Sequence, residues 1–116
     1  MHNLAESKLF YEKTLSPLGF KVAFGEKDNF WSFDVGNGAL FEIAQHKTAE
    51  KITPSHVAFR TMCEEKVQDF YAEALKAGAH CNGEPGPRPQ YTENYYAAFV
   101  IDPNGHNIEA VFDSKP

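Results

Sequence analysis

Positive charge is scarce in this chain of 116 residues. Eleven lysine and arginine residues stand against sixteen acidic ones, which gives a formal net charge of −5, and only two of the eleven are arginine. A nucleic-acid-binding surface needs a concentration of basic side chains. The charge balance therefore argues against DNA and RNA as partners.

Long hydrophobic runs are missing as well. No segment approaches the ~20 apolar residues that cross a bilayer. Residues 1–6 contain neither the basic part nor the apolar part of a secretion signal. We therefore expect no membrane association and a cytoplasmic protein.

The chain has only two cysteines, Cys63 and Cys81. The first falls at the start of a predicted helix and the second shortly after its end, so a rise of ~1.5 Å per residue puts them about 20 Å apart. That distance argues against a disulfide within the chain. We interpret both as reduced, packed side chains, with a reactive thiol as the alternative.

An internal repeat is the most informative feature that the sequence does contain. Residues 7–15, followed by Gly19, resemble residues 67–75, followed by Gly78. In the second copy the apolar side chains recur at the spacing of one helix face: Val67, Phe70, Tyr71, Ala74 and Leu75. The repeat predicts a duplicated chain with one amphipathic helix in each copy.

Local signals predict where these helices begin and end. Asn3 and Thr61 each precede a glutamate by three residues, which is the spacing of a capping box. Glycines after each helix supply the left-handed residue that commonly terminates one. We expect helices that start just after Asn3 and just after Thr61.

Alternating apolar residues predict strands around each helix. The expected strands are residues 20–24, 30–35, 39–45, 55–61, 79–82, 95–101 and 107–112. Glycine-bearing turns join 30–35 to 39–45 and 95–101 to 107–112, so each pair is predicted to be a hairpin. Residues 83–94 are rich in proline and glycine and are expected to form a rigid loop, either a lid over a site or a plain connector.

These elements predict an α+β domain made of two modules. Residues 1–46 form module one, residues 47–54 a linker, and residues 55–116 module two, with the order βαβββ in the second. By the repeat, module one lacks its first strand. A truncated start is the explanation we favour, and a strand supplied by another subunit is the alternative, because an open sheet edge offers unpaired backbone groups to a neighbour.

Strand alternation places a histidine and a glutamate on one face. Val57 and Phe59 are expected to face the helices, so His56 and Arg60 point the other way. The same argument puts Glu109 on that opposite face. Glu42 occupies the repeat-related position in module one.

A carboxylate within an apolar strand is costly unless it is paired or bound to a metal. An imidazole nitrogen and carboxylate oxygens suit zinc, nickel, manganese or ferrous iron. His56, Glu109 and Glu42 are therefore candidate ligands of a divalent metal. Alternatives stay open: Glu109 forms an ion pair with Arg60, Glu42 is an edge carboxylate, and His56 is a hydrogen-bonded core histidine.

The other polar and aromatic residues give weaker indications. Arg88 and Tyr91 lie on the predicted loop, where they are candidates for contact with a polar ligand. Three further aromatic residues are expected in the core and at its rim: Trp31, Tyr95 and Tyr96. The other four histidines are expected on the surface: His2, His46, His80 and His106.

The sequence resembles the vicinal oxygen chelate superfamily, which includes glyoxalase I, extradiol dioxygenases, fosfomycin-resistance enzymes and bleomycin-resistance proteins. The resemblance covers nearly the whole chain and rests on three segments: Asn3-Leu4-Ala5 through Leu18-Gly19-Phe20, Ser55-His56-Val57-Ala58-Phe59-Arg60, and Asp102-Pro103-Asn104-Gly105-His106-Asn107-Ile108-Glu109. It implies paired βαβββ modules, a homodimer, and a metal held by a histidine on each module's first strand and a glutamate on the last.

Carried onto this chain, the resemblance makes His56 and Glu109 the metal ligands of module two and Glu42 the carboxylate of module one. The histidine of module one has no counterpart here, so the resemblance leaves two alternatives open, a chain that binds the divalent metal and one that has lost it. Glu109 and Glu42 are the candidate catalytic residues. Arg60, Trp31, Arg88, Tyr91 and Tyr96 are the candidate contacts for a small-molecule substrate.

Two functions follow from the resemblance. The first is a glyoxalase-like metal-dependent enzyme of the lyase, isomerase or dioxygenase type, acting on a substrate that chelates the metal through adjacent oxygens. There the metal stabilises a developing oxyanion, and Glu42 or Glu109 removes a proton. The alternative is a non-catalytic dimeric protein that binds a small molecule or antibiotic in an aromatic cleft, as bleomycin-resistance proteins do.

Overall fold

The computed structural model describes residues 1–48 and 50–114. Within these residues the chain forms two α-helices, a short 3-10 turn and seven strands, in the order α1 (Leu4–Leu15), η1 (Ser16–Leu18), β1 (Lys21–Glu26), β2 (Phe30–Asp34), β3 (Leu40–Ala44), β4 (His56–Arg60), α2 (Glu64–Lys76), β5 (His80–Pro87), β6 (Tyr95–Ile101) and β7 (Asn107–Asp113). One residue of the expected linker, number 49, and residues 115–116 lie outside the described part.

The strands form two sheets that follow the internal repeat. One sheet has the order β1-β2-β3 and the other β4-β7-β6-β5. In the second, β4 pairs with β7 in parallel while the remaining pairs are antiparallel. Module two is therefore a complete βαβββ unit. Among the described residues, module one has the same elements from its helix onward, and β3 pairs with β2 alone. The predicted α+β fold is confirmed.

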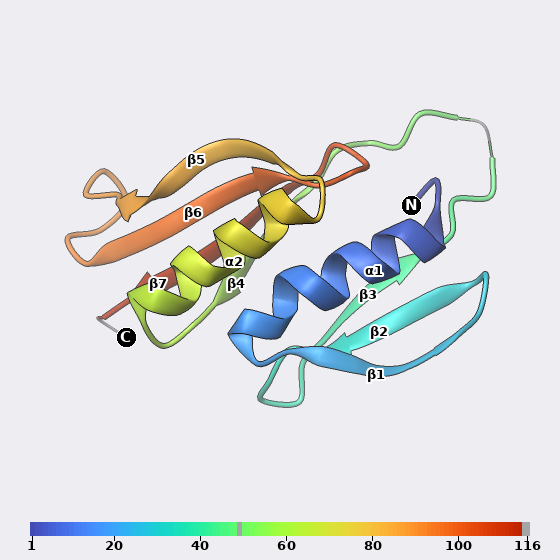
Figure 1. Cartoon of the computed structure of the whole chain (residues 1–116), viewed down its shortest axis with the longest axis horizontal. Helices are drawn as coiled ribbons and strands as arrows, with labels where there is room; N and C mark the ends of the chain where they lie inside the picture. The colour runs from blue at the N-terminus through green and yellow to red at the C-terminus, as the bar shows by residue number, and fades with distance from the viewer. Residues whose placement is uncertain (49, 115–116) are drawn as a thin grey trace.

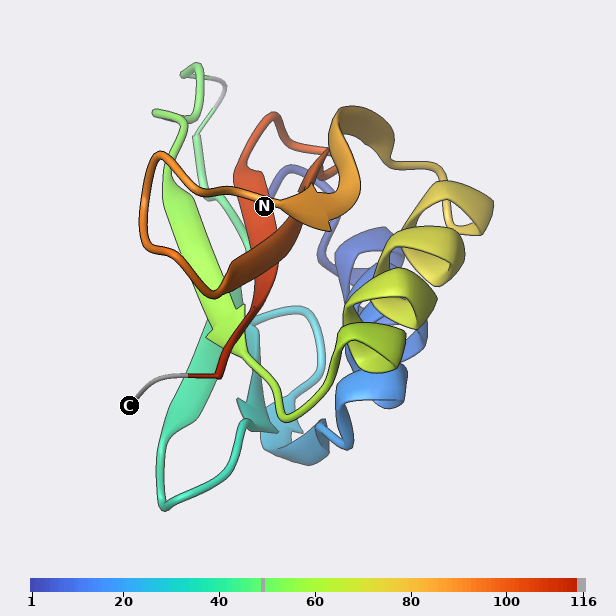
Figure 2. The same cartoon turned by 90° about the vertical axis from the view of Figure 1, so that its left-hand side faces the viewer.

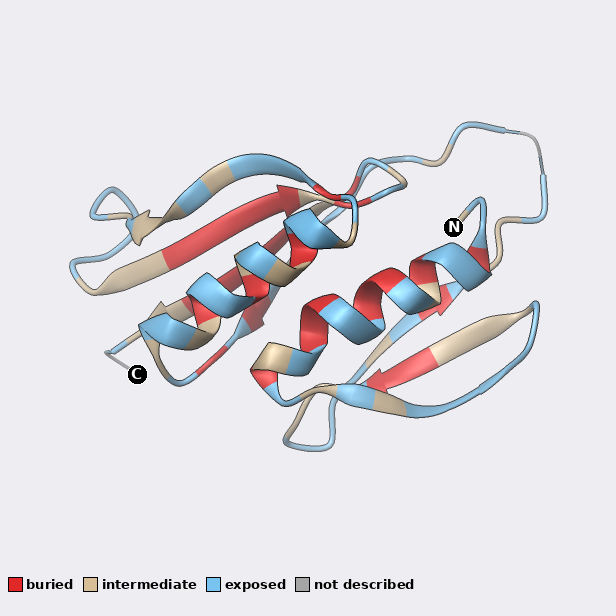
Figure 3. Cartoon of the chain, viewed as in Figure 1, coloured by how far each residue is buried: buried red, intermediate tan, exposed pale blue. Residues whose placement is uncertain are grey.

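Both helices cover the same side of the two sheets. Figure 1 shows α1 and α2 next to each other in front of the strands, and Figure 2 shows the strands from the edge with the helices on one side only. The main core fills the space between these layers and includes Tyr11, Phe33, Phe59, Phe70 and Ile108. In Figure 3 the buried residues accordingly form a stripe along each helix. We call the other side of the sheets the open face.

The two helix starts differ. The Asn3 side chain accepts a hydrogen bond from the Glu6 N–H at 3.1 Å, as the capping signal predicted. The prediction for Thr61 was wrong, because α2 is capped by Cys63, which makes no side-chain cap. Thr61 instead extends the pairing of β4 with β7. Its N–H donates to the Val111 carbonyl at 2.8 Å, and the residue is buried.

Strand β5 is longer than the sequence predicted. It continues through Pro87, so residues 83–87 of the expected loop are strand, and only residues 88–94 connect β5 to β6. β5 is the last strand of its sheet, where a proline leaves no ladder bond unmade. Two register shifts, at Cys81/Gly83 and Gly83/Gly86, accommodate the glycines as bulges.

Two expectations from composition can be compared with the fold. Cys63 and Cys81 are both free, as predicted, but the expectation that both side chains are packed was wrong for Cys81, which is exposed on the edge strand β5. Over the described residues, neither helix is long and apolar enough to span a bilayer.

Candidate functional site

His56 and Glu109 meet on the open face of the second sheet. The parallel register sets Ala58 opposite Glu109, so His56 lies diagonally across from the carboxylate on the neighbouring strand. The His56 Nε2 to Glu109 Oε1 distance is 2.9 Å. The imidazole side chain is 52% exposed and the carboxylate only 3%. A buried carboxylate thus holds a histidine whose ring reaches solvent.

Tyr95 takes the other oxygen of the same carboxylate. Its hydroxyl donates a hydrogen bond to Glu109 Oε2. Burial raises the pKa of the Tyr95 hydroxyl, and the bond to Glu109 raises it further, so the phenol keeps its proton. The sequence predicts Tyr95 only as an aromatic residue of the core or its rim. Strand alternation puts Tyr95 on the same face as Phe99, and the register of β6 and β7, which pairs Phe99 with Glu109, then brings Tyr95 to the carboxylate.

Apolar neighbours explain why Glu109 needs both partners. Ala97, Phe99 and Val111 form a small buried cluster on the open face, with Tyr95 packed against it. A carboxylate in such surroundings is stable only when its oxygens are hydrogen-bonded or ion-paired. His56 and Tyr95 together supply one partner to each oxygen of the carboxylate.

A pocket of about 360 Å³ opens beside His56. It is lined by His56, Asn82, Arg88, Tyr91 and Phe99, among others. In Figure 2 the segment between β5 and β6 projects from the strands on the side away from the helices. Two of the predicted substrate contacts, Arg88 and Tyr91, therefore share one pocket with the predicted histidine.

Arg88 is tied to the pocket wall. Its guanidinium donates to the carbonyls of Glu84 at 2.7 Å and Gly86 at 2.9 Å. It also lies over the Phe99 ring, 5.4 Å from the centroid. These bonds fix the β5–β6 connection and set a positive charge at the pocket. Tyr91 is 57% exposed and meets the Tyr95 ring edge-on at 5.0 Å.

Glu42 is not brought to the His56–Glu109 pair. It is exposed on β3 and accepts a hydrogen bond from Ser32 at 3.0 Å. Residues 1–48 and 50–114 contain no group of three or more histidine, cysteine or acidic side chains placed to hold one metal ion. Of the three predicted ligands, only His56 and Glu109 therefore lie side by side in the structure.

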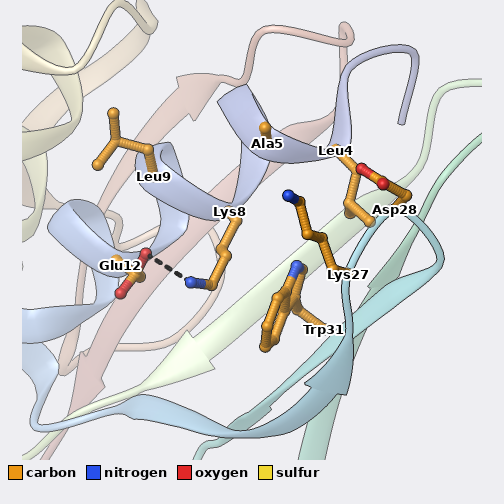
Figure 4. A pocket seen from close by; sticks show the side chains of 8 residues that line it. All are labelled: Leu4, Ala5, Lys8, Leu9, Glu12, Lys27, Asp28 and Trp31. Atoms are coloured by element: carbon orange, nitrogen blue, oxygen red, sulfur yellow. Dashed lines mark ion pairs between the residues drawn. The ribbon is translucent and has the colours of Figure 1, made fainter.

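Trp31 and Tyr96 lie on the helix side of the sheets. Figure 4 shows Trp31 beneath α1, and the Lys8 ammonium is 4.2 Å from its ring centroid. The Tyr96 hydroxyl accepts a hydrogen bond from Gln68 of α2 at 2.9 Å. Arg60 is exposed on β4, and the Glu109 carboxylate is engaged by His56 and Tyr95 rather than by this arginine.

His106 was expected on the surface, and this was wrong. The residue is 8% exposed. The Ser55 N–H donates to its Nδ1 at 3.0 Å. Asp102 closes the turn before it by accepting from the His106 N–H at 2.9 Å. The turn sequence could not reveal that partner, because Ser55 belongs to the other end of the module.

The family of the chain follows from comparison with known sequences. The model of the Glyoxalase/Bleomycin resistance protein/Dioxygenase superfamily matches residues 2–110. The chain belongs to this superfamily. A search among curated proteins finds no match.

Solved structures of superfamily proteins share the fold. A glyoxalase/bleomycin resistance protein from Albidiferax ferrireducens is 25% identical, with a TM-score of 0.83 over 95% of this chain and 90% of its own. The oxidase ChaP-H2 is 23% identical, with a TM-score of 0.67 over 97% and 86%. A variant of the fosfomycin resistance protein FosX from Listeria monocytogenes, complexed with Mn(II) and a dihydroxypropylphosphonic acid, is 16% identical, with a TM-score of 0.66 over 95% and 81%.

Proposed function

We propose that this superfamily member is a small-molecule enzyme of the glyoxalase type, whose substrate presents adjacent oxygens in the pocket beside His56. The observation that supports the proposal is the 2.9 Å contact between the exposed His56 imidazole and the buried Glu109 carboxylate. A substrate entering this pocket meets the histidine first, while Glu109 and Tyr95 fix the ring from below.

The pair fits two positions around a divalent cation. Ligand bonds of about 2.1 Å that meet at a right angle put two donor atoms about 3 Å apart, close to the separation seen here. Imidazole nitrogen and carboxylate oxygen suit Zn²⁺, Ni²⁺, Mn²⁺ or Fe²⁺. The number of ligands does not fit, because catalytic zinc sites use three protein ligands and the described residues gather two.

We assign His56 and Glu109 as the metal ligands and Glu109 as the candidate base, while Glu42, which accepts a hydrogen bond from Ser32, remains a candidate outside this pair. A bound cation would polarise the substrate oxygens. Tyr95 orients Glu109 by holding Oε2, which leaves Oε1 directed at His56. Removal of a substrate proton by a positioned carboxylate contributes about 10²–10⁴-fold in rate.

Metal titration tests the assignment. Protein stripped with EDTA is titrated with Mn²⁺, Ni²⁺, Zn²⁺ and Fe²⁺ by calorimetry, under anaerobic conditions for iron. We expect His56→Ala and Glu109→Gln to weaken binding, while His80→Ala, which removes a different exposed histidine, leaves it unchanged. Equal binding by all four proteins would exclude His56 and Glu109 as ligands.

The second candidate is a non-catalytic small-molecule binder, and the incomplete ligand set favours it. The same pocket has aromatic walls from Tyr91 and Phe99 and a fixed cation from Arg88. A binder raises the melting temperature with ligand concentration but converts nothing. Thermal shifts with planar anionic compounds, followed by product analysis, separate the two functions. We also propose that the protein works as a homodimer in the cytoplasm, which light scattering and cell fractionation test.

A further inference from the structure

Arg88, just after the end of β5, keeps two donors and a positive charge that the described residues do not use. Its Nη1 donates to the carbonyls of Gly86 at 2.9 Å and Pro87 at 3.2 Å, and its Nη2 donates to the Glu84 carbonyl at 2.7 Å. None of the ion pairs among the described residues includes this arginine. A guanidinium has five N–H donors. One on Nε and one on Nη2 are therefore left, and we call this side of the planar group the free edge.

Two glycines of β5 make room for the guanidinium. A Cβ atom at Gly83 would lie 3.2 Å from Nη2 and 3.0 Å from Phe99 Cδ1, and one at Gly86 would lie 3.3 Å from Nη1. The φ angle of Gly83 is +154°, which favours glycine. The bulged strand thus holds the charge of Arg88 in one place over the Phe99 ring. A group that is already fixed loses little freedom when it binds a ligand.

The pocket brings this charge within reach of a ligand at His56. Gly83, Arg88, Phe99 and His56 all line the cavity of about 360 Å³. The Arg88 Cζ atom and the centre of the His56 ring lie 5.4 and 6.2 Å from the centre of the Phe99 ring, so they are at most about 12 Å apart. Contacts of about 3 Å at each end leave at most about 6 Å between the two ligand groups that they bind.

We propose that this pocket takes a small organic acid, whose carboxylate pairs with the free edge of Arg88 and whose second oxygen, no more than about 6 Å away, lies against His56. The inference rests on the proposed function in one respect, that the pocket beside His56 is the ligand site. A carboxylate fits because its two oxygens match two neighbouring N–H donors. It also carries the single negative charge that one unpaired guanidinium balances. The exposed Tyr91 ring in the pocket lining suits a flat carbon frame.

Two probes of the same shape separate charge from fit. One is 3-hydroxybenzoate, a flat acid whose hydroxyl oxygen lies within the distance limit given above. The other is 3-hydroxybenzamide, in which a neutral amide replaces the carboxylate. Calorimetry with the full chain, treated with EDTA and kept at pH 7, gives the dissociation constant of each. We expect the acid to bind at least about tenfold more tightly than the amide, because only the acid forms a charge-assisted pair with Arg88.

Variants assign this preference to Arg88. Arg88→Gln removes the charge and should lower the preference for the acid to about twofold or less. The ratio of the two dissociation constants is the readout, because a purely structural role of the arginine would weaken both probes alike. Lys76→Gln is the control: it removes one charge from an exposed side chain of α2 and should keep the ratio.

Circular dichroism checks that each variant folds. If Arg88→Gln does not fold, Arg88→Lys decides. This change keeps the charge but not the planar fork, so it should lose at least about threefold of the preference.

Three results would overturn the proposal. An acid that binds no better than the amide, or not at all, means that the pocket does not recognise a carboxylate. A preference that is unchanged in the folded Arg88 variants means that another residue provides it. Phenylphosphonate that binds more tightly than 3-hydroxybenzoate means that the site takes a phosphonate or phosphate group instead.

The metal titration stays a separate test, because all these measurements use metal-free protein. A failed titration with an intact preference for the acid rejects only the metal-dependent enzyme. Intact metal binding without that preference rejects only the organic acid as the ligand.

Discussion

The Tyr95 hydroxyl donates to the Glu109 carboxylate on the neighbouring strand, inside an apolar cluster on the open face. Tyr95 acts on the pocket indirectly: it holds Glu109, and Glu109 in turn holds His56, which lines the pocket. It is a positioning residue, and its removal is expected to affect the pair that lies in front of it.

Tyr95→Phe tests this relationship. The change keeps the ring and deletes the donor, so one oxygen of a buried carboxylate loses its partner. We expect the free energy of unfolding to fall by about 1–3 kcal/mol and metal affinity to fall about tenfold or more. Urea titration and calorimetry measure the two effects. Tyr91→Phe is the matched control on the exposed rim and should change the free energy of unfolding little.

Tyr11→Phe is expected to weaken the contact between the modules. The Tyr11 hydroxyl on α1 donates to Asp102 at 2.5 Å, and both residues are buried. A buried hydrogen bond to a charged acceptor is worth about 1.5–3 kcal/mol. Urea unfolding at pH 7 measures the loss, and a midpoint unchanged from the wild-type protein would contradict it.

Alkaline pH should destabilise the protein through the same tyrosine. Burial, the charge of Asp102 and the hydrogen bond to it raise the pKa of Tyr11 above its ordinary value. The folded protein therefore holds this proton more tightly than the unfolded chain. The resulting stability is fully present below about pH 10 and is lost as the pH rises further. Urea unfolding at a series of pH values from 8 to 11 should show that the free energy of unfolding falls less in Tyr11→Phe than in the wild-type protein.

Gly25→Ala should disturb the environment of Trp31. A Cβ atom at Gly25 would lie 2.3 Å from the indole and 2.5 Å from the Phe30 carbonyl, so the ring and the backbone must move. Such overpacking costs about 1–3 kcal/mol. Trp31 is the single tryptophan, so a shifted fluorescence maximum reports the movement directly. Removal of the indole in Gly25→Ala/Trp31→Leu should give a cost smaller than the sum of the two single changes.

The start of α2 can be improved. Cys63 is in the cap position with an extended backbone but makes no side-chain cap. Cys63→Ser supplies an oxygen acceptor of similar size and should raise the free energy of unfolding by about 0.5–1 kcal/mol. The reference is Asn3→Ala, which removes the existing cap of α1 and should lower it by about 1 kcal/mol. Thermal melts should show a higher melting temperature for Cys63→Ser and a lower one for Asn3→Ala than for the wild-type protein.

Local periodicity predicted most of the fold. β6 has the predicted bounds, and β2, β3, β4 and β7 differ from prediction by one residue at one or both ends. The alternation of apolar residues also predicted that His56 and Glu109 share a face. The reason is that each strand side chain takes its side from its immediate neighbours, which the sequence lists in order.

Distances along a strand and between distant segments required the tertiary structure. Tyr95 reaches Glu109 because β6 and β7 pair in one register, and His106 is buried because Ser55 lies beside its turn. β5 extends through its glycines and prolines because it lies at an edge, where bulges are tolerated. None of these outcomes is encoded within a window of ten residues.

The amino-acid sequence by itself determined the repeat, the two helices, the order of the strands and the shared face of His56 and Glu109, since these depend on local spacing. Only the tertiary structure decided which groups touch: it joined His56 and Tyr95 to Glu109, left Glu42 with Ser32, and turned Trp31 and Tyr96 toward the helices. Contacts between strands depend on register and packing across the whole chain, and these are set when all the elements bury their apolar faces together.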